Sequence, residues 1–375
     1  MAGVIAQKGD LDRAMKLWQE SLEIEESIGN VKGKAATLAN MAGVIAQQGD
    51  VDRAMKLWQE SLDLKESIGD VKGKAATLAN MAGVIAQQGD VDRAMTLWQE
   101  SLEILDKIGD VKGKAATLGN MAGVIAQQGD VDRAMELWQE SLDLKDKIGD
   151  VQGKAATLNN MAGVIAKQGD VDRAMKLWQE SLELKEKIGD VRGKAATLAN
   201  MAWAAGQNGD RVQELELNFQ AARALADIRA WPDLIIVLGN LGSGESPQAI
   251  CFLAQALWLL LRTTAPIDDS VVNAARLLQK IGTDSEHGPY VAAAAVYFAA
   301  TRGEAHPKKD ELQGLASRML LACAQARNLT QEQLETWVSS EGLLDPSRWH
   351  PRLEGSLAHL VGDEKNWLFD RSVFL

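Results

Sequence analysis

Apolar residues recur at helical spacing along a run that starts at Ala75. The run AATLANMAGVIAQQ carries apolar side chains three and four residues apart, at Leu78, Met81, Ala82 and Ile85. Such a stripe is typical of one face of an amphipathic helix. The pattern therefore predicts a first helix that buries this face against a neighbour.

A second helix is predicted directly after the first. Gly89 ends the first helix, and Asp90 can cap the next one because its side-chain oxygen accepts a hydrogen bond from a free backbone N–H. The following run, VDRAMTLWQESLEILDKI, has one apolar face, formed by Val91, Ala94, Trp98, Leu102 and Ile108. Gly109 ends this helix and Asp110 opens the next unit. Each unit is thus an antiparallel helix pair, and only stacking against neighbouring units buries its apolar faces.

The helix pair repeats every 40 residues. Residues 41–80 and 81–120 differ at only 7 of 40 positions, and slightly altered copies occupy 1–40, 121–160 and 161–200. Residues 201–240 keep the glycine and aspartate that mark the helix ends, but few of the other residues of the unit. A fixed period of this length indicates stacked supersecondary units.

The unit resembles a tetratricopeptide repeat. Numbered from Ala75, it has the typical small, apolar and aromatic residues at positions 4, 8, 15, 20 and 24, which are Leu78, Ala82, Gly89, Ala94 and Trp98. It departs from the pattern in the extra glycine at position 9, in Ile85 at position 11 and in the missing proline near position 32. The 40-residue period is similar to the longer repeats of kinesin light chains, Pins-type scaffolds and many bacterial proteins. The resemblance implies an all-α, right-handed superhelical solenoid of helix pairs.

The chain divides into three parts on this pattern. Residues 1–200 hold five near-identical units, 201–265 hold two degenerate units, and 266–375 form an all-helical domain that caps the array. Glycine and proline breakers predict helices at 231–242, 246–265, 267–281, 289–302, 308–327, 330–341 and 352–361. The aromatic tail, residues 366–375, is expected to dock on this domain.

The first unit starts in the middle of a helix. Met1 falls at position 7, so Met1 to Lys8 form half a helix and leave an uncapped interface. We expect the chain to be a piece of a longer solenoid or the product of an internal start. Fraying of this end, or self-association through it, is a further expectation.

Composition and charge limit the classes of partner that the chain is expected to bind. The formal net charge of −12 and the pI near 5.0 argue against a nucleic-acid or anionic-membrane surface. Two cysteines make no disulfide framework, which favours the cytoplasm. The longest apolar run, Ile250 to Leu261, is interrupted by Gln255 and is too short to span a bilayer, which takes roughly 20 residues.

Candidate binding residues lie on the first helices. Positions 2, 6, 9 and 13 share one helical face, which lines the concave groove of a tetratricopeptide array. Position 6 is asparagine in six units, at Asn40, Asn80, Asn120, Asn160, Asn200 and Asn240. A carboxamide both donates and accepts hydrogen bonds, which suits the main chain of an extended peptide. These residues resemble the groove asparagines of kinesin light chains and bacterial Rap-type receptors. Alternatively, duplication repeats an asparagine that bonds a neighbouring helix.

Gln87 and Gln127 occupy position 13 of the same groove face. Two departures from the repeat could give the groove specificity: Asn159 stands beside the asparagine row, and Trp203 replaces a position-9 glycine. A groove-facing indole could anchor an apolar ligand side chain, or Trp203 could pack as a cap against the C-terminal helices.

Five periodic tryptophans are predicted to be core: Trp18, Trp58, Trp98, Trp138 and Trp178. Five periodic lysines are expected to form a solvated ridge or a weak rail for an acidic ligand: Lys34, Lys74, Lys114, Lys154 and Lys194.

Catalytic signals are poor. The four histidines are scattered without metal-ligand spacing, and the glycine-rich GNLGSGES at 239–246 lacks the lysine of a phosphate-binding loop. We therefore predict a non-catalytic protein-interaction module, without cofactor, that binds an extended peptide or partner segment. Two alternatives stay open. One is the sensor portion of a larger bacterial signalling or defence protein, such as a STAND ATPase or a caspase-like protease. The other is a self-assembling structural solenoid.

Overall fold

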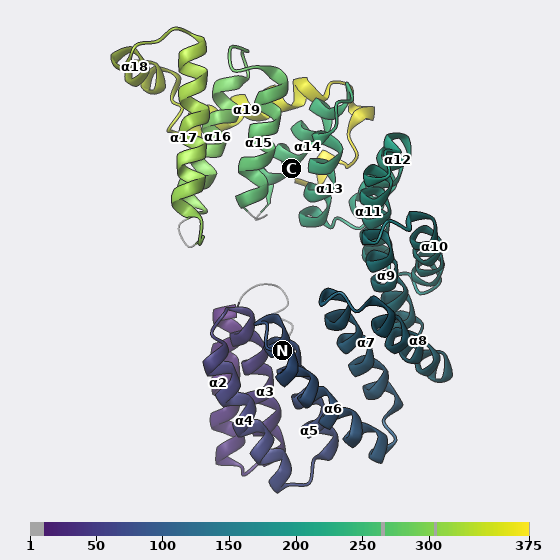
Figure 1. The fold of residues 1–375 in the computed structure, drawn as a ribbon. Helices are drawn as coiled ribbons and strands as arrows, with labels where there is room; N and C mark the ends of the chain where they lie inside the picture. Colours follow the sequence, from purple (N-terminus) through teal and green to yellow (C-terminus); the bar gives the residue numbers. More distant parts are fainter. Residues whose placement is uncertain (1–10, 264–266, 304–305, 375) are drawn as a thin grey trace. The chain divides into compact units, whose positions relative to one another are not determined.

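The computed structural model describes residues 11–263, 267–303 and 306–374. These residues form eighteen α-helices and two short 3-10 turns, and none of them lies in a strand (Figure 1). The predicted all-α fold is confirmed. The predicted half helix at Met1 to Lys8 lies outside the described residues.

The chain separates into two compact units, residues 1–184 and 185–375, and the division falls inside helix α10 (Val171–Lys187). The first unit contains α2 (Leu11–Ser27), α3 (Val31–Gln47), α4 (Val51–Ser67), α5 (Val71–Gln87), α6 (Val91–Ile108), α7 (Val111–Gln127), α8 (Val131–Ile148) and α9 (Val151–Lys167). This division separates two groups of residues that pack mainly among themselves, and it does not use the repeat pattern. The repeat-based boundaries after residues 200 and 265 stay a prediction.

Aspartates and glycines set most of the helix ends in the repeats. Asp90 accepts a hydrogen bond from the Arg93 N–H at 3.2 Å and caps α6, as predicted. Gly89 has φ +92°, a left-handed conformation that costs glycine little. The first helix of the pair begins at Val71, four residues before the predicted Ala75. The reason is that Asp70 caps it through the Gly73 N–H, so the VKGK segment is helical.

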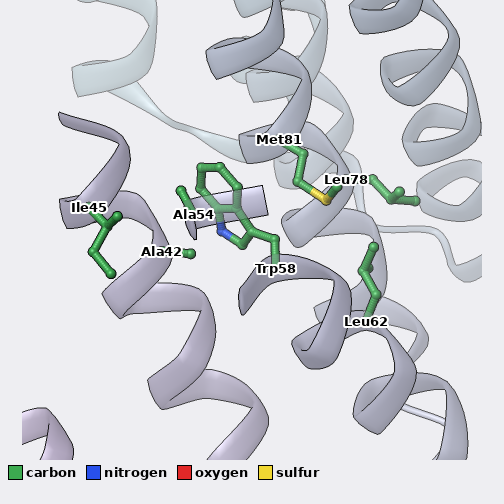
Figure 2. Packing of buried hydrophobic residues seen from close by; sticks show 7 residues of the cluster. All are labelled: Ala42, Ile45, Ala54, Trp58, Leu62, Leu78 and Met81. Atoms are coloured by element: carbon green, nitrogen blue, oxygen red, sulfur yellow. The ribbon is translucent and has the colours of Figure 1, made fainter. Parts of the chain in front are cut away.

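The periodic tryptophans form the core of the array, as predicted. Trp58 packs with Ala42 and Ile45 of its own pair and with Leu78 and Met81 of the next pair (Figure 2). We call this contact between a tryptophan and the next pair a joint. The same joint recurs 80 residues later, where Trp138 packs with residues 158 and 161. All five tryptophans are buried. Trp58, Trp98 and Trp138 each pack against residues of two neighbouring pairs, which is how stacking completes the core.

The second unit continues as helices to the end of the described chain. Its helices are α11 (Val191–Gln207), α12 (Arg211–Asp227), α13 (Trp231–Ser243), α14 (Ala249–Arg262), α15 (Ile267–Ile281), α16 (Gly288–Thr301), α17 (Lys309–Ala326), α18 (Gln331–Glu341) and α19 (Pro346–Val361). They match the predicted ranges closely except α19, which starts six residues earlier than predicted. Asp345 caps it and Pro346 stands at its first position, where proline loses no helical hydrogen bond.

The aromatic tail docks on α13 and α14, which belong to the two degenerate units and precede the domain that was expected to hold it. The Trp258 ring of α14 lies 5.6 Å from the Trp367 ring and 5.9 Å from the Phe369 ring. Gln255, which interrupts the apolar run, is fully buried. Its amide donates to the Asn366 carbonyl at 3.0 Å and accepts from the Leu368 N–H at 2.8 Å. The glutamine thus satisfies backbone groups of the tail that would otherwise be buried unpaired.

Candidate binding site on the first helices

The asparagine row is exposed along the first helices. All six predicted asparagines have exposed side chains. Among the described residues, no protein group hydrogen-bonds the side-chain amides of Asn40, Asn80, Asn120 and Asn160, which all belong to the first unit. These four carboxamides keep both donors and acceptors available to a ligand.

A pocket lies between the first helices of two consecutive pairs. It has a volume of about 330 Å³, and its lining includes Ala76 and Asn80 of α5, Ala116 and Asn120 of α7, and Leu105 of α6. The alanines are small, so a ligand backbone can approach both helices closely. The two asparagines of the row and an apolar residue thus share one concave site.

The other predicted residues are placed differently. Gln87 and Gln127 are exposed near the C-terminal ends of α5 and α7, away from this pocket, and Asn159 is half-buried on α9. Trp203 of α11 is 46% exposed. Asn240 lines a separate pocket of about 390 Å³ in the second unit, together with Arg211, Glu214 and Asn218. The structure therefore groups Asn80 and Asn120 but does not bring every predicted residue into one site.

The periodic lysines hold neighbouring pairs together instead of forming a solvated ridge. Lys114 reaches Asp106 of the preceding pair at 3.0 Å and Glu140 of its own pair at 3.2 Å. The hydrogen bond with Asp106, aided by Glu140, raises the pKa of the Lys114 ammonium. Lys34 and Lys74 each make the equivalent two ion pairs. The ammonium groups of these half-buried lysines are therefore already paired with carboxylates of the chain itself.

A second lysine row is buried, and the sequence pattern alone did not reveal it. Lys65 and Lys145 are only 6% and 8% exposed, and each ammonium donates to a threonine hydroxyl of the next first helix, Thr77 or Thr157, at 2.5 Å. Burial lowers the pKa of both ammonium groups. The equivalent residue of the intervening pair is Leu105, which lines the pocket. A change of chemical type within near-identical repeats is the signal that could have identified this position.

We expect Lys65→Leu to stabilise the first unit by about 1–2 kcal/mol, because it removes a buried charge and adds apolar burial. Leu105 shows that leucine fits the position, and the Thr77 hydroxyl still donates to the Gly73 carbonyl at 3.1 Å. The gain is measured by urea unfolding. Lys56→Leu, at an exposed site on the same helix, should change stability by less than about 0.5 kcal/mol.

The gain should also depend on pH with a defined sign. The pKa of Lys65 is lower in the folded chain than its ordinary value of 10.5, so the folded state holds this proton less tightly than the unfolded state. The cost of the lysine is full below the folded-state pKa and shrinks as the pH rises toward 10.5. A gain from Lys65→Leu that grows with pH would contradict this assignment.

No helix among the described residues is long and apolar enough to cross a membrane. The histidine, cysteine and acidic side chains of the same residues form no group that could hold a metal ion.

Comparisons with known proteins agree with the repeat pattern. The tetratricopeptide repeat model matches residues 73–147 and 153–227. No curated protein matches the sequence significantly. Among solved structures, BtubC (BKLC) from P. vanneervenii is 20% identical with a TM-score of 0.52, over 58% of this chain and 92% of that one. A signal transduction ATPase with numerous domains (STAND) from Pyrococcus horikoshii, which has a tetratricopeptide repeat sensor, is 16% identical with a TM-score of 0.53. That match covers 94% of this chain and 47% of the ATPase chain. Residues 73–147 and 153–227 of this chain therefore belong to the tetratricopeptide repeat family.

Proposed function

We propose that this chain is a non-catalytic interaction module that binds an extended peptide segment along the first helices of its first unit. The observation that carries the proposal is the pocket between α5 and α7, whose lining includes the exposed amides of Asn80 and Asn120, which no other described residue pairs. Tetratricopeptide repeats form protein-interaction modules, and the family match supports this class of function. The peptide, and its binding in the cytoplasm, are part of the proposal.

The spacing of the row suits an extended chain. Neighbouring packed helices lie roughly 10 Å apart, and an extended peptide advances about 3.3 Å per residue. One asparagine should therefore meet the ligand backbone about every third residue. Its amide can donate to a ligand carbonyl and accept from a ligand N–H, whatever the ligand side chains are.

A photo-crosslinking experiment tests the location of binding. Peptides are first selected for binding to the wild-type chain from a displayed random library. A benzoylphenylalanine at Ala116, an exposed residue of the pocket, should then cross-link the selected peptides. The same group at Gln99, an exposed residue on the second helix α6 outside this pocket, should not. Equal cross-linking at both positions, or cross-linking only at Gln99, would refute the proposal.

A second candidate is the sensor part of a larger signalling ATPase. The STAND structure motivates it, because its fold is similar over 94% of this chain while this chain spans only 47% of that protein. An ATPase domain encoded in frame beside this sequence would favour this candidate. Peptide binding would then be the sensing event of the larger protein.

A further inference from the structure

One position of the repeat varies in chemical type where its surroundings are nearly constant. We name it the floor residue, and in successive pairs it is Glu25, Lys65, Leu105, Lys145 and Lys185. Leucine fits the position, as Leu105 shows, so packing does not require a lysine there. A buried, desolvated ammonium lowers stability relative to an apolar residue of similar size. The lysines therefore fit a binding role better than a structural one.

Lys65, Leu105 and Lys145 lie beside the first helices of the pairs that follow them in the first unit. Leu105 lines the pocket whose lining includes Asn80 and Asn120. Lys145 holds the same position one pair later, where it bonds Thr157 of α9. A methyl group added at Gly119 of α7 would lie 3.7 Å from the Lys145 ammonium. Lys145 is thus enclosed by the two first helices that flank it, as Leu105 is.

The floor lysines of the first unit have donor capacity to spare. None of the ion pairs of the described chain includes Lys65 or Lys145; Asp70 and Asp150, at the caps of the following helices, attract them only at longer range. An ammonium has three donors, and one of them is used by the threonine hydroxyl. A carboxylate brought to such a site forms a charge-assisted hydrogen bond where water screens little.

We propose that the floor residues Lys65 and Lys145 each bind an acidic side chain of the peptide, and that Leu105 contacts an apolar side chain between them. These three peptide residues are spaced three positions apart. This inference rests on the proposed function, since the asparagines would hold the backbone while the floor selects side chains. The spacing follows from roughly 10 Å between neighbouring helices and about 3.3 Å per peptide residue. Because the order is symmetric, the peptide can run in either direction.

The test uses fluorescein-labelled peptides and anisotropy titration of the full chain. The probe is Ser-Asp-Ala-Ser-Leu-Ala-Ser-Asp-Ala, and the control peptide has asparagine in place of both aspartates. Wild type should bind the aspartate peptide about 10- to 100-fold more tightly, the range for hydrogen bonds to charged groups. The double variant L105K/K145L moves the apolar floor by one joint. It should instead prefer peptides ordered Asp-Asp-Leu or Leu-Asp-Asp at the same spacing.

The variants use residue types that the chain already carries at this position. A lysine at residue 105 would have Thr117 as its counterpart of Thr77 and Thr157, and a leucine at residue 145 is the residue type that the chain already carries at 105. Should the double variant fail to fold, Lys145→Met keeps the length of the side chain and should remove the preference for one of the two aspartates.

Two outcomes overturn the inference. One is equal binding of the aspartate and asparagine peptides by wild type, and the other is a double variant that keeps the wild-type preference. Cross-linking at Ala116 then separates the two claims. Peptides that still cross-link there leave the proposed function standing without floor selection, whereas peptides that never cross-link there refute both.

Discussion

Trp98→Ala should lower the free energy of unfolding by about 3–5 kcal/mol, the range for deleting a large buried aromatic side chain. Trp98 is 0% exposed and packs with Ala82 and Ile85 of its own pair and with Met121 of the next. The cavity opens at a joint, so two pairs lose contacts together. In a stacked array the loss should stay local and split the denaturant transition into two steps.

Two tryptophan-to-phenylalanine variants sharpen this test. The Trp98 indole donates to the Ala79 carbonyl at 3.2 Å, whereas the Trp58 indole has no hydrogen-bond partner among the residues that the structure describes. Trp98→Phe should therefore cost about 0.5–1.5 kcal/mol more than Trp58→Phe. A near-neutral Trp98→Ala in urea unfolding would mean that the joint is not the core of the array.

The triple variant Asn80/Asn120/Asn160→Ala should weaken peptide binding by about one to three orders of magnitude. Each amide contributes roughly 0.5–1.5 kcal/mol if it makes one net hydrogen bond to the ligand backbone. The fold should persist, because the three side chains are exposed and alanine is the better helix former. Isothermal titration with a selected peptide measures the loss, and the melting temperature reports on the fold.

The chain offers a matched control for this variant. Gln59, Gln99 and Gln139 are exposed amides at one position of the second helices, also 40 residues apart. Their triple replacement by alanine should leave affinity unchanged within about twofold. Unfolding of the asparagine variant, or an equal loss of affinity in the glutamine variant, would show that the asparagines do not hold the ligand.

Local rules made most of the fold predictable. Asp90 and Gly89 mark their helix ends through backbone chemistry within a few residues, and Trp98 falls on the apolar face whatever its neighbours are. The exposure of Asn80 follows from the same periodicity. These features depend on sequence distances of one to four residues, which the pattern displays directly.

The remaining features depend on contacts between pairs. Lys114 and Lys145 are both lysines on helical faces, yet one joins two carboxylates and the other lies buried against a threonine. Hydropathy patterns assign both to a solvated face. The two lysines differ in their surroundings because different side chains of the neighbouring helices pack against them. Gln255 is a similar case, because its partners lie more than 100 residues away in the tail.

The recurring tryptophan joint also makes the array divisible. Since Trp58 and Trp138 meet the following pair through the same residue types, excision of residues 81–120 would join Asn80 to Met121 within one continuous helix and recreate the same joint. Recombination between near-identical coding repeats produces such excisions. It would remove Leu105 and set Lys65 and Lys145 in consecutive joints. A single genetic event could therefore change what the module recognises without requiring any compensating substitution in its core.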